Sequence, residues 1–247
     1  MGNRGAAGLY CSGVGMLEIK VIGVGGIGCA LLPHLARYLQ ASGGRTRLTL
    51  VDGDAFEVRN GDRQAFPELG NKAKVKAAEL ARQFEDLSFR AIPEFVTPEN
   101  VGRIIRSGDV VFLAVDNHRT RRLVSDQCQV LPEVTLISGG NDYIDGNVQV
   151  YIRRAGRDVT LPLTRFHPEI ADPKNRSPQE MSCDELSQEA GPQLLFTNLA
   201  VASAMLNAFY AWRQGKLQYG EVYLDILEGK SNPVVREALP EPHRAAD

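Results

Sequence analysis

The chain has 247 residues, a formal net charge of −2, 43% hydrophobic residues and 23% charged residues. This length is sufficient for one α/β domain with a sizeable core, and the mixed charge argues against a dedicated nucleic-acid surface. No apolar run is long enough to cross a membrane, so no membrane partner is expected. The four cysteines contain no CxxC pair, which favours neither a zinc site nor a disulfide framework and indicates a reducing, cytoplasmic location: Cys11, Cys29, Cys128 and Cys183.

The first elements in the chain form a βαβ unit. A strand is expected over Leu17–Ile22, a helix over Cys29–Leu39 and a second strand over Arg47–Val51. Between the first strand and the helix lies a GxGGxG turn: Gly23, Gly25, Gly26 and Gly28. Glycine permits positive φ and close approach of phosphates, and the helix that follows points free N–H groups at them.

Asp52 directly follows the second strand, where a carboxylate accepts hydrogen bonds from ribose hydroxyls. The glycine turn and this acid together predict an adenine-nucleotide site. A turn that is glycine-rich only for packing is the alternative.

The remaining elements alternate between helices and strands. They are expected as a helix over Asn71–Phe84, a strand over Phe89–Phe95, a helix over Pro98–Ile105 capped by Thr97, a strand over Asp109–Val115, a helix over Arg119–Val130, strands over Val134–Ser138 and Asn147–Arg154, a helix over Gln193–Trp212 and a strand over Glu221–Leu227, with residues 233–235 pairing back. Residues 155–192 are interrupted by prolines and show no periodicity, which predicts a long functional loop. We therefore expect an α/β fold with a Rossmann-like core in one domain over residues 16–236, between a flexible lead (1–15) and a flexible tail (237–247).

Polar side chains gather where parallel strands should end, which is where ligands bind in open α/β sheets. They are Asp52, Asp54, Asn60, Arg63, Gln64, Lys72, Asp116 and Asn117. Hydride transfer has no use for an arginine and a lysine on the phosphate side, so a dehydrogenase is disfavoured. Adenylation, in which a carboxylate attacks the α-phosphorus of ATP, does need them.

Each of these residues suits one part of that reaction. Arg63 can hold phosphate oxygens bidentately, and Lys72 offers a point charge to the leaving side. Asp116, with or without Asp54, can hold Mg²⁺. Asn60 and Gln64 can orient the nucleotide by hydrogen bonds.

Structural roles are the alternative for each residue alone. Arg63 can be a solvated loop arginine, Lys72 can share an exposed helix face with Lys74 and Lys76, and Asp116 can cap a helix. Their joint occurrence in this order favours the catalytic interpretation.

Five separated motifs resemble the ThiF/MoeB/HesA family, the bacterial relatives of ubiquitin-activating enzymes. The resemblance covers roughly Leu17 to Leu227 and rests on GxGGxG (Gly23–Gly28), DxD (Asp52, Asp54), NxxRQ (Asn60, Arg63, Gln64), NKA (Asn71–Ala73) and DNxxxR (Asp116, Asn117, Arg121). It implies a mixed, mostly parallel sheet of about eight strands, a homodimer, and ATP- and Mg²⁺-dependent adenylation of the C-terminal glycine of a ubiquitin-like or sulfur-carrier protein. It further implies that Asp52 holds the ribose, that Asn60, Arg63 and Lys72 hold the phosphates, and that Asp116 holds the metal.

Cys183 lies just before the last helix, where members of this family often carry a cysteine that accepts the activated acyl group or sulfur. A loop cysteine without a role is the alternative. The zinc-binding CxxC pairs of many members are absent, and the segments around His167 and Cys183 resemble the ThiF-like proteins of the PRTRC system. Two other functions stay open: adenylation of a small-molecule or tRNA carboxylate, and a nucleotide-binding partner subunit without turnover.

Overall fold

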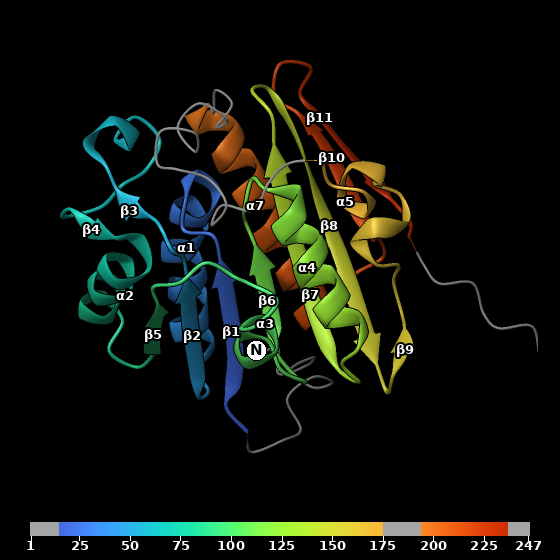
Figure 1. The fold of residues 1–247 in the computed structure, drawn as a ribbon, viewed down its shortest axis with the longest axis horizontal. Coiled ribbons are helices and arrows are strands. Elements are labelled where there is room, and N and C mark those ends of the chain that lie inside the picture. The colour runs from blue at the N-terminus through green and yellow to red at the C-terminus, as the bar shows by residue number, and fades with distance from the viewer. Residues whose placement is uncertain (1–14, 175–193, 237–247) are drawn as a thin grey trace, which may run out of the picture.

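A computed structural model describes residues 15–174 and 194–236 of the chain. Its central sheet has nine strands in the order β11-β10-β8-β7-β6-β1-β2-β5, with β9 paired to β8 (Figure 1). The strands are β1 Leu17–Ile22, β2 Thr46–Val51, β5 Ser88–Ile92, β6 Val110–Leu113, β7 Val134–Asn141, β8 Asp145–Arg154, β9 Arg157–Asp158, β10 Glu221–Asp225 and β11 Lys230–Val234. A separate two-stranded ladder pairs β3 Ala55–Phe56 with β4 Gly70–Asn71.

The sheet is mixed. Strands β7, β6, β1, β2 and β5 run parallel to one another. Strands β8, β10 and β11 join on one side by antiparallel pairing. Parallel strands need a covering layer on both faces, because their side chains are buried on both. The expected Rossmann-like α/β fold is therefore confirmed.

Helices cover both faces of the sheet (Figure 1). They are α1 Gly26–Ser42, α2 Lys72–Gln83, α3 Val101–Ile104, α4 His118–Gln129, α5 Pro168–Ala171 and α7 Leu195–Arg213, with short 3-10 turns η1 Val58–Asn60 and η2 Leu163–Arg165. Side chains of α1, α2 and α7 share one hydrophobic cluster, and those of α3, α4 and α5 share the other. No helix among the described residues has the length and apolarity that crossing a bilayer requires.

Several element boundaries differ from the sequence-based expectation. Strand β5 ends at Ile92 because Pro93 lacks the N–H that a ladder needs. Thr97 does accept hydrogen bonds from two N–H groups, but residues 98–100 form a turn and α3 begins only at Val101. Strand β8 starts at Asp145, two residues before the expected start at Asn147.

The expectation that residues 155–192 lack elements was wrong for the part that the structure describes. This part holds β9, η2 and α5. Single apolar residues, Leu163 and Ile170, fix the latter two by inserting into the core. An element with only one buried apolar residue shows no periodicity in the sequence, so only the tertiary contact reveals that the element exists.

Candidate functional site

One cleft of about 1570 Å³ lies beside the carboxyl ends of β1, β2, β6 and β7. It is lined by every residue predicted for the site except Gly28, which is a packing residue, and Cys183, which lies outside the described residues. This volume exceeds the range of about 300–1000 Å³ that is usual for one small ligand. The cleft therefore has room for a nucleotide and for part of a second substrate.

The glycines of the turn between β1 and α1 serve different purposes. Gly23 has φ of 90°, and a Cβ there would lie 2.7 Å from the carbonyl oxygen of Ala114 on the neighbouring chain segment. A Cβ on Gly28 would lie 2.2 Å from the carbonyl oxygen of Gly23, so this position permits close packing of helix on turn. A Cβ on Gly26 would collide with Asn198 of α7.

Gly25 is the glycine of the turn whose missing side chain leaves open space in the cleft. The nearest atom to a Cβ there is 3.9 Å away, so none of the described residues fills that space. Helix α1 has no side-chain cap and no acidic residue in its first turn. Its first N–H groups are thus left for an anion from outside the chain, as a phosphate-binding helix start requires.

Asp52 is held rigidly at the end of β2. One carboxylate oxygen accepts the N–H of Val24 at 2.6 Å, and the other accepts the N–H of Asp54 at 2.8 Å. Burial raises the pKa of Asp52 to about 6, although Lys72 and the two N–H bonds oppose the shift. Each oxygen keeps a second lone pair, so the carboxylate can still accept ribose hydroxyls.

The β3–β4 ladder brings two motifs together that are distant in sequence. It closes the loop between them, so that the N–H of Lys72 donates to the carbonyl of Asp54. The side chain of Asn71 caps α2 and donates to the carbonyls of Asp52 and Asp54, at 2.9 and 3.0 Å. Asn71 is therefore the group that ties the DxD segment to the start of α2.

Lys72 points into the cleft rather than to solvent. It is 8% exposed, and its Nζ lies 3.2 Å from a carboxylate oxygen of Asp54. Lys76 is also buried, whereas Lys74 is exposed. The alternative of one exposed lysine face was thus wrong for two of the three residues. Asp54 is engaged by Lys72, which leaves Asp116 as the better candidate for a metal.

The segment after η1 supplies the other cation. Arg63 and Gln64 are anchored by their backbone N–H groups, which both donate to the carbonyl of Asn60. The Nε of Arg63 and the Oε1 of Gln64 are buried and have no hydrogen-bond partner within the described residues. Such unpaired buried atoms are rare in folded proteins, and here both belong to residues that line the cleft. The two side chains therefore keep hydrogen-bonding capacity that no described residue uses.

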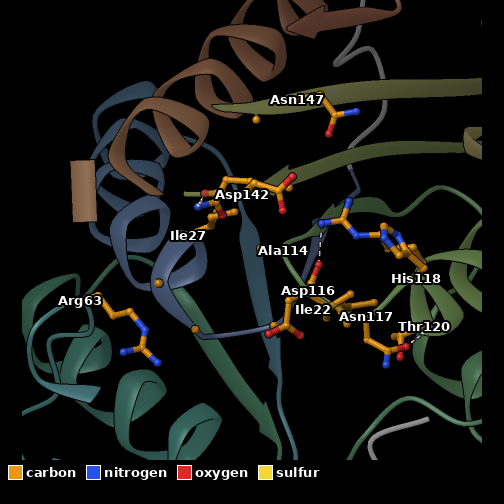
Figure 2. Close-up of a pocket in the computed structure, with 18 of the residues that line it drawn as sticks. Ile22, Ile27, Arg63, Ala114, Asp116, Asn117, His118, Thr120, Asp142 and Asn147 are labelled. Carbon is orange, nitrogen blue, oxygen red and sulfur yellow. Dashed lines mark hydrogen bonds between the residues drawn. The ribbon is translucent and has the colours of Figure 1, made fainter. Parts of the chain in front are cut away.

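Asp116 borders the cleft across from Arg63, whose guanidinium reaches toward the same space (Figure 2). Its carboxylate is exposed and lies between β6 and α4. The proposed capping role of Asp116 was wrong, because Asn117 caps α4 by accepting the N–H of Thr120 at 3.0 Å.

Arg121 holds the segment that carries Asp116, a role that the sequence motif did not reveal. Its guanidinium donates to the carbonyls of Val115 and Gly139 and to the hydroxyl of Ser138, at 2.6, 2.7 and 3.0 Å. Burial lowers the pKa of Arg121 to about 10, so it remains a cation at neutral pH. The DNxxxR motif therefore places the carboxylate of Asp116 at the cleft. The buried guanidinium of Arg121 joins the segment after β6 to β7.

The residues present fit a magnesium ion that is shared with phosphates. Mg²⁺ usually takes one or two carboxylates together with phosphate oxygens and water. Within residues 15–174 and 194–236, no group of three or more His, Cys, Asp or Glu side chains converges to form an all-protein metal site. The exposed carboxylate of Asp116, which borders the cleft, is a donor that such a shared ion needs.

The far wall of the cleft contains a buried ionic network that sequence reasoning missed. His167 contacts Glu169 through Nδ1 and Glu221 through Nε2, both at 2.7 Å. Burial disfavours the charged form of Glu221, but the bonds from His167, Arg236 and Asn147 prevail and lower its pKa to about 2. The network fixes α5 and the end of the described chain against β8 and β10.

Comparisons with known proteins agree with this geometry. The chain is 37% identical over 137 residues to the adenylyltransferase and sulfurtransferase MOCS3 of Bos taurus, covering 54% of this chain and 29% of that protein. It is 34% identical over 138 residues to MOCS3 of Dictyostelium discoideum, covering 54% of this chain and 31% of that protein. The structure of E. coli MccB with ATP matches with a TM-score of 0.67 at 18% identity, covering 91% of this chain and 66% of that one.

The chain spans only about three tenths of the length of the curated relatives it matches. At 18% identity, the likeness to MccB concerns the fold. The profile of the ThiF family, however, matches residues 13–224, which include the glycine turn, both acid motifs and the buried lysine of α2. With these motifs meeting in one cleft, this chain belongs to the ThiF family.

Proposed function

We propose that this protein adenylates the C-terminal glycine carboxylate of a small ubiquitin-like or sulfur-carrier protein, with ATP as the second substrate. The observation that carries the proposal is the convergence of uncapped N–H groups, Arg63, Lys72 and Asp116 on one cleft. The adenylyltransferase name of the MOCS3 relatives supports it, and so does the fold shared with ATP-bound MccB.

Each side chain has a role that follows from its place. Asp52 accepts the ribose hydroxyls, and the start of α1, with Gly25, receives phosphate oxygens. Asn60 and Gln64 orient the nucleotide by hydrogen bonds, while Asn117 keeps the start of α4 in place beside it. Arg63 and Lys72 neutralise charge on the phosphates from the side opposite Asp116.

The chemistry is one displacement at phosphorus. A carboxylate oxygen of the acceptor forms a bond to the α-phosphorus, the bond from that phosphorus to the bridging oxygen breaks, and pyrophosphate leaves with the electron pair. Arg63 and Lys72 stabilise the charge that builds on the equatorial and leaving oxygens. Asp116 would hold Mg²⁺, which when bound neutralises phosphate charge.

Pyrophosphate exchange tests the proposal directly. Radiolabelled pyrophosphate should enter ATP only when a carrier protein ending in glycine is present, and Arg63→Ala should exchange at least tenfold more slowly. A carrier whose last glycine is deleted is the control. Exchange driven instead by a small carboxylate or tRNA, or ATP binding without any exchange, would replace the proposal by one of the two alternatives.

We further propose that Cys183 accepts the acyl group from the adenylate and that AMP leaves. The thiolate forms a thioester bond to the carbonyl carbon as the bond from that carbon to the AMP oxygen breaks, and the thiol proton passes to solvent. Cys183 lies outside the described residues, so this proposal rests on its place in the sequence. A thioester band that is sensitive to thiols and lost in Cys183→Ala tests it, and exchange activity should survive that change.

A homodimer remains our proposal for the assembly. Helix α7 is apolar around much of its circumference, and it exposes Phe196, Leu199 and Tyr210 by 65%, 42% and 54%. A helix of this composition is usually covered on all sides. Sedimentation should give twice the monomer mass, and Phe196→Glu should reduce that mass if a second copy covers this face.

A further inference from the structure

Helix α2 turns two lysines toward the protein interior. Lys72 and Lys76 are four residues apart and therefore lie on one face, whereas Lys74 points away to solvent. Lys72 reaches the cleft, but Lys76 does not line it and is only 2% exposed. The proposed reaction gives this second buried ammonium no task.

Lys76 contacts two consecutive residues of the segment before β4, and one glutamate of its own helix. Its Nζ donates to the carbonyl of Ala65 and to a carboxylate oxygen of Glu79, the latter at 2.6 Å. The same Nζ lies 4.7 Å from the ring centroid of Phe66. The Ala65 carbonyl is thus held from α2.

Ala65 directly follows two residues that line the cleft and whose side chains carry unpaired buried polar atoms. The side chains of Arg63 and Gln64 do not anchor themselves, since the Nε of Arg63 and the Oε1 of Gln64 have no partner among the described residues. The guanidinium does touch Asp62, but that carboxylate is largely exposed and the pair is weak. Their direction therefore depends on the backbone contacts at Asn60 and at Ala65.

We propose that Lys76 is a positioning residue for the nucleotide site, which fixes the Ala65 carbonyl so that Arg63 and Gln64 face the phosphates. The buried ammonium is paired with Glu79, and the hydrogen bond that remains for it ends on the backbone beside Arg63 and Gln64. The inference rests on the proposed binding of ATP. It adds a residue outside the cleft to the groups that determine affinity.

The test measures ATP binding by titration calorimetry in the presence of Mg²⁺ on the full chain. Lys76→Met keeps the apolar stem but cannot donate to Ala65, and it should weaken ATP binding about tenfold, the scale of one charge-assisted hydrogen bond. Lys76→Arg should restore most of the affinity. Lys74→Met, on the same helix but exposed, is the matched control and should bind as the parent does. If Lys76→Met does not fold, Lys76→Gln, which keeps a neutral donor, takes its place.

A double-mutant cycle separates positioning from a general structural role. If Lys76 acts through Arg63 and Gln64, the tenfold effect of Lys76→Met should shrink below about twofold in a background that carries both Arg63→Ala and Gln64→Ala. Equal effects in both backgrounds, or unchanged affinity in Lys76→Met, overturn the positioning role while the proposed function stands. No ATP binding by the parent chain overturns both.

Discussion

Replacing Lys72 by methionine is the most informative change to the site. The substitution keeps the length of the side chain and its apolar stem, and it removes only the ammonium that lies 3.2 Å from Asp54. Lys74→Met removes a lysine from the same helix, two residues away, where the side chain is exposed. The two variants have the same change in net charge, so any difference between them reports the position of the charge.

The expected effect on catalysis is larger than the effect on stability. The partner Asp54 has a side chain that is 44% exposed, so water screens the pair and its loss should cost less than about 1 kcal/mol of folding free energy. One charge-assisted hydrogen bond to a phosphate contributes about 1.5–3 kcal/mol to the transition state. Its loss should lower kcat/KM for exchange by about 10- to 150-fold.

The pH dependence should also change. Lys72 is the leading group that opposes the raised pKa of Asp52, so without it that pKa should rise further from about 6. More of the ribose-binding carboxylate is then protonated at pH 7. Part of the activity lost in Lys72→Met should return between pH 7 and 8.5, measured by pyrophosphate exchange. Equal exchange rates for Lys72→Met and Lys74→Met would refute the phosphate role of Lys72.

Three further predictions follow from the geometry. Gly25→Ala should keep the melting temperature but weaken ATP binding at least tenfold, because the added methyl group enters the cleft. Gly28→Ala should instead destabilise the fold, because its added methyl group would lie 2.2 Å from the carbonyl oxygen of Gly23. Arg121→Met leaves two backbone carbonyls unpaired and should lower the free energy of unfolding by about 3 kcal/mol in urea, and an unchanged value would contradict its structural role. The pKa of Asp52 is raised from 3.8 to about 6 in the folded state, which therefore binds the proton more tightly than the unfolded state does. The contribution of Asp52 to the free energy of unfolding should therefore fall by up to about 3 kcal/mol as pH rises from 4 to 6. Asp52→Asn should remove that slope, and an identical slope in the variant would show that Asp52 does not cause it.

The local elements were predicted well wherever one residue pattern extends over a whole element. Strand β1 was predicted with its observed bounds, and α2 and α4 to within a few residues, because their apolar periodicity is continuous. The segment from Arg157 to Ala171 was missed, since β9, η2 and α5 are too short to show a period and form only by docking on the sheet.

The sequence by itself determined the family and the set of polar groups in the cleft. The glycine turn and the acids Asp52 and Asp116 follow parallel strands, which end at a common edge, so these groups had to gather there. The tertiary structure decided which lysine of α2 faces the cleft, which residue caps α4 and which arginine is buried behind Asp116. Those choices depend on the β3–β4 ladder and on the packing of α2 and α4, in which residues far apart in the chain compete for the same space.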